Sequence, residues 1–366
     1  MAITRIGNPA IADVRGVNFR NIIINGDMSI AQRGTSATGI GNGDNGYHTV
    51  DRFKFSEAGS PTAEFTMSQE TDVPTGQGFA KSLKWNCTTA QASLGASDRL
   101  TFTQSFEGQN LQYLKKGTSS AESTILSFWT KSTKTGTYIC ELRDLDNGRS
   151  ISKSYTINSA DTWEKKTIAF DGDTTGTLDN DNASSFSVTF WFGAGSNFSS
   201  GTLNTSWNAL TDANRAVGQV NLADSTSNEW YVTGIQLEAG SQASDFEFLP
   251  HDVNLRRCQR YCYSESAGDT YHNYMNGFYS SSSLFIGNIN LPTSMRSGPS
   301  LTTSGTFRTA GAVGSSTSNF IILDSNVKDV NTIQFRATVS GATSGQGAVF
   351  RNDDDATATF ILSSEL

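Results

Sequence analysis

The feature that most constrains this chain is a set of short segments in which apolar and polar residues alternate. The clearest is the segment 333–339, Ile-Gln-Phe-Arg-Ala-Thr-Val. Alternation with a period of two gives a strand one buried face and one polar face. Strands of this kind form antiparallel sheets that pack as a sandwich. The same pattern predicts further strands at 82–87, 126–131, 138–143, 187–192, 284–289, 320–323 and 357–362.

The composition also favours an all-β protein. The 366 residues include 34 Gly, 22 Phe, 10 Tyr and 6 Trp. Aromatic side chains favour half-buried pleated surfaces, and glycine supplies the turns between them. No segment between the predicted strands has the pattern of a crossover helix, which excludes a parallel α/β sheet. The chain has no repeat of fixed length, which disfavours a solenoid or a triple β-helix.

We predict four parts in the chain. Residues 1–18 lack periodicity and form either an arm that anchors the chain to a larger assembly or a disordered terminus. Residues 19–250 form a jelly-roll β-sandwich. Apolar residues recur at helical spacing from Leu255, so residues 251–263 form a short helical hinge. Residues 264–366 form a smaller C-terminal β-sandwich.

The sequence disfavours several partners and compartments. The formal net charge is −8 and the basic residues are scattered, so we expect no nucleic acid partner. No run reaches the roughly 18 apolar residues of a spanning helix, so we expect no membrane insertion. The first residues lack the apolar core of a signal peptide, which predicts synthesis in a cytoplasm. Four cysteines fit no disulfide framework and are expected to be buried free thiols: Cys87, Cys140, Cys258 and Cys262.

Three segments carry a resemblance to known proteins. Residues 21–33 lead through an apolar stretch into Asn-Gly-Asp, and residues 230–241 contain an alternating stretch that ends in Gln-Leu-Glu. Residues 255–261 read Leu-Arg-Arg-Cys-Gln-Arg-Tyr. The first two resemble the ends of a carbohydrate-binding-module-type jelly roll, in which the first and last strands lie side by side. The set, from Val17 to Tyr263, resembles tail-fibre and receptor-binding proteins of bacteriophages.

This resemblance implies a phage virion protein, a tail fibre that binds a host-surface polysaccharide or lipopolysaccharide. It also implies a homotrimer that assembles with other virion proteins and leaves the host at lysis. The absence of a stalk of heptads or repeats favours an alternative, a head decoration or adaptor protein with a structural role. A glycan depolymerase is the less supported third reading. The sequence holds no recognisable catalytic motif, so we expect no enzymatic activity.

The resemblance also implies a structural cation. Carbohydrate-binding modules of this shape often hold calcium where the first and last strands meet, and Asp27 and Glu238 match that place. Two carboxylates, backbone carbonyls and water can supply the six to eight oxygens that calcium needs. The alternative is that Asp27 makes a turn through its side chain and that Glu238 is a solvated residue at a sheet edge.

A glycan-binding face is a further candidate. Trp129 and Trp191 lie in the polar phase of their predicted strands, and Glu141 and Arg143 share that phase on a neighbouring strand. If these strands share a sheet, one face displays two indoles beside a charged pair, which suits the apolar patches and hydroxyls of sugars. The alternative is a second apolar layer covered by a loop, because indoles in sandwiches usually pack.

The segment 47–53, Tyr-His-Thr-Val-Asp-Arg-Phe, resembles an Asp-Arg-aromatic sequence that follows the first loop of tail-fibre proteins. We expect Asp51 and Arg52 to form an ion pair or to cap a backbone end there, which is a structural role rather than sugar binding.

Overall fold

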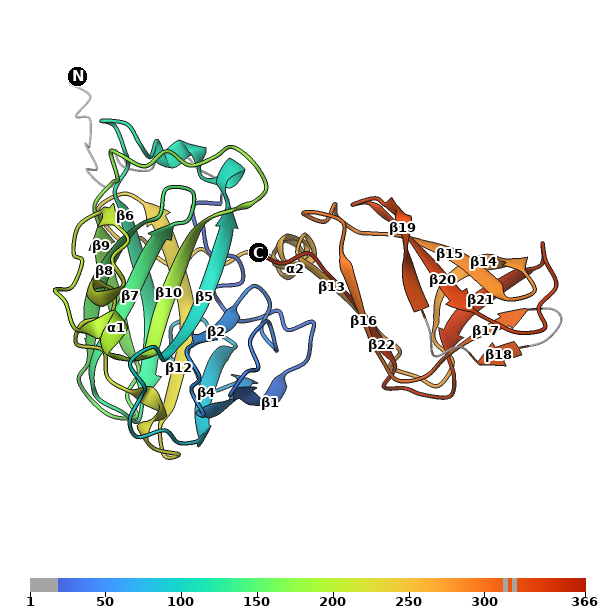
Figure 1. Ribbon diagram of the computed structural model, residues 1–366, viewed down its shortest axis with the longest axis horizontal. Coiled ribbons are helices and arrows are strands. Elements are labelled where there is room, and N and C mark those ends of the chain that lie inside the picture. Colours follow the sequence, from blue (N-terminus) through green and yellow to red (C-terminus); the bar gives the residue numbers. More distant parts are fainter. Residues whose placement is uncertain (1–18, 312–314, 318–320) are drawn as a thin grey trace, which may run out of the picture.

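The computed structural model describes residues 19–311, 315–317 and 321–366. The predicted arm at 1–18 lies outside these residues. The described chain forms four antiparallel sheets, arranged as two sandwiches with a short helix between them (Figure 1). The predicted all-β fold, a larger N-terminal sandwich followed by a smaller one, is confirmed.

The first sandwich consists of two six-stranded sheets. Sheet A has, in spatial order, β1 (Ser36–Gly41), β3 (Glu64–Glu70), β4 (Ser82–Thr89), β12 (Glu229–Ala239), β6 (Thr124–Ser132) and β9 (Glu164–Phe170). Sheet B has β11 (Asn208–Ala209), β8 (Arg149–Ile157), β7 (Gly136–Asp144), β10 (Ser184–Ala194), β5 (Arg99–Glu107) and β2 (Lys54–Ala58). Short helical turns, including α1 (Ser196–Ser199), occupy the loops.

The core of this sandwich is aromatic, as the alternation predicts. Trp85 and Trp230 come from sheet A, and Phe102 and Phe192 come from sheet B; all four are fully buried. The rings of Trp85 and Phe102 meet edge to face with centroids 5.7 Å apart, and those of Phe192 and Trp230 do so at 5.1 Å. Because aromatic pairs prefer this geometry and bury large areas, they fix how the two sheets stack.

The second sandwich packs a three-stranded sheet against a seven-stranded one. The first holds β13 (Cys262–Ser266), β22 (Thr359–Ser363) and β16 (Ser300–Ser304). The second holds β18 (Ser315–Thr317), β17 (Phe307–Gly311), β21 (Gly347–Asn352), β14 (Asn273–Ser281), β15 (Leu284–Asn290), β20 (Thr332–Thr338) and β19 (Ile321–Lys328). Phe285, Phe335, Phe350 and Phe360 are buried between them.

The predicted helical segment forms α2 (His251–Gln259), which joins the two sandwiches (Figure 1). Cys258 and Tyr261 are buried against Ile24 and Ile30 of the first sandwich. The helix is therefore packed on its inner side rather than free. All four cysteines are buried free thiols, as predicted.

The start of the described chain does lie beside β12, although it is not a regular strand. The Ile22 amide donates to Leu237 O at 2.8 Å, and the Ile235 amide donates to Gly26 O at 2.9 Å. Between these points Asn25 has a φ of 62°, which interrupts any ladder. Gly26 is required by close approach, since a Cβ there would lie 2.0 Å from Ile235 O. The predicted adjacency is thus present without the predicted strand.

Candidate functional site

The structure places the two predicted platform indoles on opposite sides of the first sandwich. Trp129 projects from the outer face of sheet A and is half-buried. Trp191 projects from the outer face of sheet B, where it is fully buried. The two side chains therefore do not form one surface. The condition on which the predicted platform depended, that the two strands share a sheet, is not met.

Trp191 belongs to a second apolar layer outside sheet B. It packs with Ile139, Phe198 and Ala216, all buried. The segment 195–216, which includes α1, covers the indole. A period of two distinguishes the two faces of a strand, but it does not distinguish solvent from a covering loop. The alternative reading of this face, an apolar layer under a loop, is the one that the structure shows.

Glu141 is also buried and is paired structurally. Arg215, from the covering segment, donates Nε to Glu141 Oε1 at 2.8 Å and a second guanidinium nitrogen to Oε2 at 2.9 Å. Both residues are at most 3% exposed. Bidentate pairs of this kind fix orientation, so Glu141 anchors the covering segment. Arg143, the fourth predicted glycan residue, remains partly exposed on the same face.

The outer face of sheet A carries a different set of aromatic and charged side chains, which we call the sheet A cluster. Tyr231 on β12 lies beside Lys131 on β6, since the two are direct cross-strand partners. The Lys131 ammonium lies 4.2 Å from the centroid of the Tyr231 ring and 5.6 Å from that of Trp163. Both distances suit a cation–π contact. Trp129 is two positions before Lys131 on the same face.

Two carboxylates hold the sheet A cluster together. Asp72 is paired with Lys131 and accepts a hydrogen bond from Trp163 Nε1 at 3.0 Å. Glu229 accepts from the Tyr231 hydroxyl at 2.8 Å and pairs with Lys84 at 2.7 Å. The rings are thus fixed by charged partners instead of by a covering loop. Half-buried Trp163 and exposed Asp72 remain open to solvent.

These contacts also set the charge of the cluster. Burial raises the pKa of Tyr231 to about 12, and the hydrogen bond to Glu229 acts in the same direction. Burial tends to raise the pKa of Asp72, but the hydrogen bonds from Lys131 and Trp163 prevail and lower it. The pKa of Glu229 is likewise lowered by Lys84 and Tyr231 against the effect of burial. The two carboxylates therefore stay ionised, and the phenol stays protonated, near neutral pH.

Sequence reasoning missed Lys131, Tyr231 and Trp163 as site residues. Lys131 shares the phase of Trp129, and Tyr231 lies in the outward phase of the alternating segment 230–238. The alternation of apolar and polar residues could therefore have identified Lys131 and Tyr231 as residues of the outer face. Trp163 precedes β9 in a loop without periodicity, and its proximity to Tyr231, with ring centroids 6.1 Å apart, arises only from the fold.

The two predicted calcium ligands lie at different ends of the pairing with β12. The Asp27 carboxylate accepts from Ser29 Oγ and Asn254 Nδ2, both at 3.1 Å, and its carbonyl lies beside Thr233. Glu238, further along β12, accepts from the amide and the hydroxyl of Ser244 at 2.8 and 2.7 Å. A separation from Thr233 to Glu238 corresponds to roughly 15 Å of strand. The geometry does not bring the two carboxylates to one cation.

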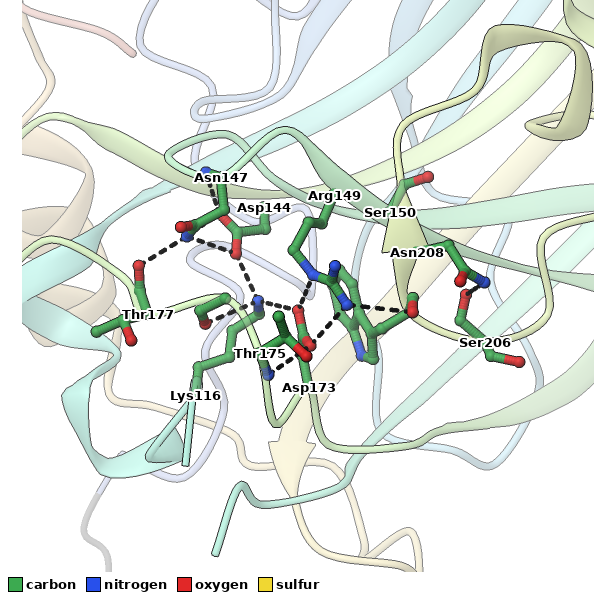
Figure 2. Close-up of polar contacts among 12 residues, drawn as sticks. Lys116, Asp144, Asn147, Arg149, Ser150, Asp173, Thr175, Thr177, Ser206 and Asn208 are labelled. Atoms are coloured by element: carbon green, nitrogen blue, oxygen red, sulfur yellow. Dashed lines mark hydrogen bonds and ion pairs between the residues drawn. The ribbon is translucent and has the colours of Figure 1, made fainter. Parts of the chain in front are cut away.

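A network of polar contacts and ion pairs joins Lys116, Asp144, Arg149 and Asp173 in the first sandwich (Figure 2). The Lys116 ammonium donates to Asp144 Oδ2 at 2.6 Å and to Asp173 Oδ2 at 2.8 Å. Arg149 donates Nε to Asp173 Oδ2 at 2.8 Å. The side chains of Lys116, Asp144 and Asp173 are at most 5% exposed. Here an ammonium from the chain neutralises the buried carboxylates.

This network fixes three loops. Lys116 precedes β6, Asp144 ends β7, and Asp173 follows β9, so one ammonium joins three connections of the sandwich. Asn147 adds a hydrogen bond to the Asp144 carboxylate at 2.9 Å (Figure 2). Within the described residues, no group of three or more His, Cys, Asp or Glu has the arrangement of a metal site. The network is structural.

Comparisons with known proteins found only distant likenesses. The sequence matches no protein-family model and no curated protein. Among solved structures, the enzymatically active domain of tailspike protein 4 of bacteriophage CBA120 matches with 14% identity and a TM-score of 0.31. The match covers 61% of this chain and 22% of that chain, so the likeness spans about a fifth of the tailspike chain's length.

Carbohydrate-binding modules are also similar in structure. The family 11 module of the cellulosomal cellulase Lic26A-Cel5E of Clostridium thermocellum matches with 14% identity and a TM-score of 0.28. That match covers 54% of this chain and 94% of the module. A family 4 module matches with 9% identity and a TM-score of 0.28, covering 59% of this chain and 98% of the module. Likenesses this distant assign no activity to the chain.

Proposed function

We propose that this chain binds polysaccharide through the sheet A cluster. The observation that supports this most directly is the position of Lys131 between the rings of Tyr231 and Trp163, with Asp72 paired to both Lys131 and Trp163. Tyr231 is buried at 8% exposed, while Trp163 and Trp129 are half-buried, so the two indoles are the rings that a ligand can reach, and charged neighbours hold Trp163 in place. No rotamer has to be ordered when a ligand arrives, which lowers the entropic cost of binding.

The chemistry of this surface suits a sugar chain. The C–H face of a pyranose ring is apolar and can stack on the indole of Trp163 or Trp129. Asp72 is 48% exposed and accepts hydrogen bonds, and Lys84 donates them. Hydroxyl groups on a stacked sugar would therefore meet both kinds of partner. An extended sheet face also suits a polymer better than an enclosed pocket.

We further propose that the chain works in a phage virion, as a tail fibre that attaches to a host-surface polysaccharide or lipopolysaccharide. The support is the resemblance carried by three segments, which the fold brings into contact. Residues 21–26 pair with β12, and Cys258 and Tyr261 pack on Ile24 and Ile30. A homotrimer would present several weak sugar sites at once and so raise avidity. A head decoration or adaptor role is the alternative, and we propose no catalysis.

A binding experiment with matched variants tests the glycan proposal. The purified chain is presented with immobilised lipopolysaccharides and capsular polysaccharides from a panel of bacteria, with neutral dextran alongside. Trp163→Ala should weaken binding about ten-fold or more, because a stacking surface and the donor to Asp72 are both lost. Tyr271→Ala removes an aromatic side chain that is 53% exposed in the second sandwich and should change nothing.

The same experiment separates the two virion roles. A tail fibre should bind at least one surface glycan, and binding should fall with Trp163→Ala while the melting temperature is kept. A decoration or adaptor protein should bind none of the panel. If binding occurs and Trp163→Ala and Tyr271→Ala behave like the parent, the sheet A cluster is not the site.

A further inference from the structure

Three arginines gather on the outer face of sheet B, on the side of the sandwich opposite the sheet A cluster. Arg99 begins β5, Arg143 lies on β7, and Arg215 belongs to the segment that covers Trp191. The guanidinium carbons of Arg99 and Arg215 both lie 5.8 Å from the centroid of the Phe198 ring. These two cations therefore flank one aromatic ring.

Only one of these arginines has carboxylate partners. Arg215 is held by Glu141 through two hydrogen bonds and by Asp212 at 3.1 Å. Within the described ranges, the guanidinium groups of Arg99 and Arg143 form no hydrogen bond or ion pair, although the backbones of both residues are paired in the sheet. The Nε atoms of both are buried without a partner. The site thus holds three guanidinium groups and two carboxylates, both of which are already engaged by Arg215.

The local electrostatics follow from this imbalance. Burial lowers the pKa of Arg99, and the charges of Arg215 and Arg143 lower it further. The charges of Glu141 and Asp212 oppose this shift without reversing it. Burial also lowers the pKa of Arg143, and the charge of Arg215 adds to the effect. Like charges that are partly withdrawn from water repel one another, and an anion placed between them relieves that repulsion. The rest of the chain is acidic, with a net charge of −8, so this positive site is local.

Hydroxyl groups line the strip of sheet between Arg143 and Arg99. Ser187 on β10 is the cross-strand partner of Arg143, and Thr189 is the partner of Thr103 on β5. The hydroxyls of Thr103 and Thr189 lie 3.0 Å apart. Ser187 and Thr189 are buried, at 3% and 4% exposed, whereas Thr103 is partly exposed, so Thr103 is the hydroxyl of these three that a ligand can reach. The partly exposed guanidinium groups of Arg99 and Arg143 are therefore the main polar groups here for a sugar that carries an acidic group.

We infer that Arg99 and Arg143 form a second binding site, specific for an oxyanion carried by a polysaccharide, such as a uronate carboxylate or a sulfate ester. The planar guanidinium fork matches the geometry of both groups. Thr103, which is partly exposed between them, would contact an adjoining sugar hydroxyl. The site lies on a different sheet from the sheet A cluster, so it stands independently of the function proposed above.

The test uses the full chain and defined polymers. Polygalacturonate and dextran sulfate are the acidic probes, neutral dextran is the uncharged probe, and inorganic phosphate is the free oxyanion. The parent chain should bind both acidic polymers despite its own negative charge. Arg99→Gln and Arg143→Gln should each weaken this binding by about ten-fold, because each removes a charge-assisted contact. Neutral dextran should not bind at this face.

Two controls make the result decisive. Arg256→Gln removes the same charge from an exposed position on α2 and should leave binding to the acidic polymers unchanged. Trp163→Ala should also leave it unchanged, which separates this site from the sheet A cluster. The inference is overturned if the parent does not bind the acidic polymers, or if Arg256→Gln weakens binding as much as Arg99→Gln does. Displacement of the polymers by inorganic phosphate at equal oxyanion concentration would overturn the requirement for a sugar chain.

Discussion

Arg52 and Glu365 are 313 residues apart in the sequence and form a buried ion pair. Their side chains are 0% and 5% exposed. The same guanidinium lies 3.5 Å from the centroid of the Tyr261 ring and donates to Ser105 O at 2.7 Å. Residues at the end of the second sandwich thus return to the first and meet it beside α2.

Neighbouring contacts strengthen this junction. The Tyr47 hydroxyl donates to Leu366 O at 2.6 Å, and Arg33 lies 3.3 Å from Glu365. At the C-terminal end of α2, Arg260 pairs with Glu107 at 2.6 Å. The sequence predicted a local structural role for Asp51 and Arg52, as a pair or a cap. The structure instead pairs Arg52 with the distant Glu365, while Asp51 accepts from the Gln32 amide at 3.0 Å. The two sandwiches are therefore joined by buried charges as well as by the helix.

We expect Glu365→Gln to lower the free energy of unfolding by about 3–5 kcal/mol, because the guanidinium of Arg52 would stay buried without its counter-charge. Urea unfolding followed by tryptophan fluorescence measures the change. Asp353→Asn is the matched control, since its partner Arg308 lies at 3.1 Å and both side chains are about a quarter exposed. That pair should contribute about 1 kcal/mol or less. Equal effects of the two substitutions would contradict a buried, structural pair.

The neighbouring residue Asp51 should make stability depend on pH. Burial raises the pKa of Asp51 to about 6, although hydrogen bonds from Gln32 and the charge of Arg33 oppose the rise. Between about pH 4 and 6 the folded state keeps this proton and the unfolded state does not. The contribution of Asp51 to the free energy of unfolding therefore falls as the pH rises through that window.

Asp51→Asn removes the titrating group, so the variant should gain stability relative to the parent as the pH rises from 4 to 7. The relative gain is of the order of 2–3 kcal/mol, the size expected of a shift of about two pKa units. Urea unfolding of both proteins at pH 4, 5, 6 and 7 measures it. Parallel pH profiles for the two proteins would show that Asp51 does not titrate in this window.

How far the sequence predicts the structure is clearest on β10. The alternation correctly placed a strand at 187–192 and assigned Phe190 to the core. It also separated Trp191 from the core side, which is correct, but it took the other side for solvent. The covering segment 195–216 has no periodicity and its position follows from tertiary contacts such as Arg215 with Glu141. Contacts between segments that are distant in the sequence cannot be inferred from the local alternation of residues.

For the apolar segment 21–24 the sequence predicted the neighbouring strand correctly but the secondary structure wrongly. Its composition is that of a strand, and the adjacency to β12 was correctly predicted. The backbone nevertheless leaves the extended region at Asn25, where the side chain takes over the pairing by accepting from the Ile30 amide at 2.9 Å. Asparagine tolerates a positive φ and bonds locally to the backbone. The sequence alone does not show that the side chain of Asn25 replaces the backbone pairing of a strand, because its hydrogen-bond partner is known only from the structure.

The two indoles that the sequence grouped together should respond differently to substitution. Trp191→Ala should lower the free energy of unfolding by about 3–5 kcal/mol, because it opens a cavity beside Phe198 and Ile139. Trp129→Ala should cost well under half of that, since its side chain is only half-buried. Urea unfolding of the two single variants measures both changes. Similar losses would contradict the placement of Trp191 under the covering segment.

The ion network around Lys116 allows a test of how much buried charges stabilise the first sandwich. Lys116→Met leaves Asp144 and Asp173 buried without the ammonium, so we expect a loss of about 3–5 kcal/mol in the free energy of unfolding at pH 7. Lys115→Met is the control at the next position. Lys115 is half exposed and pairs with Glu122 on the surface, so its loss should be about 1 kcal/mol or less.

Lowering the pH should reduce the difference in the free energy of unfolding between Lys116→Met and the parent. In the parent the pKa of Asp173 is lowered to about 2: burial opposes the shift, but the hydrogen bonds from Arg149 and Lys116 outweigh it. A lowered carboxyl pKa contributes stability that is present above about pH 4 and is lost as the pH falls toward 2. The variant has less of this stability to lose, and protonation removes the repulsion between its two carboxylates. A gap that stays constant from pH 7 to pH 2 would show that Lys116 stabilises the fold by packing on Trp207, 4.4 Å from its ring centroid, rather than by charge.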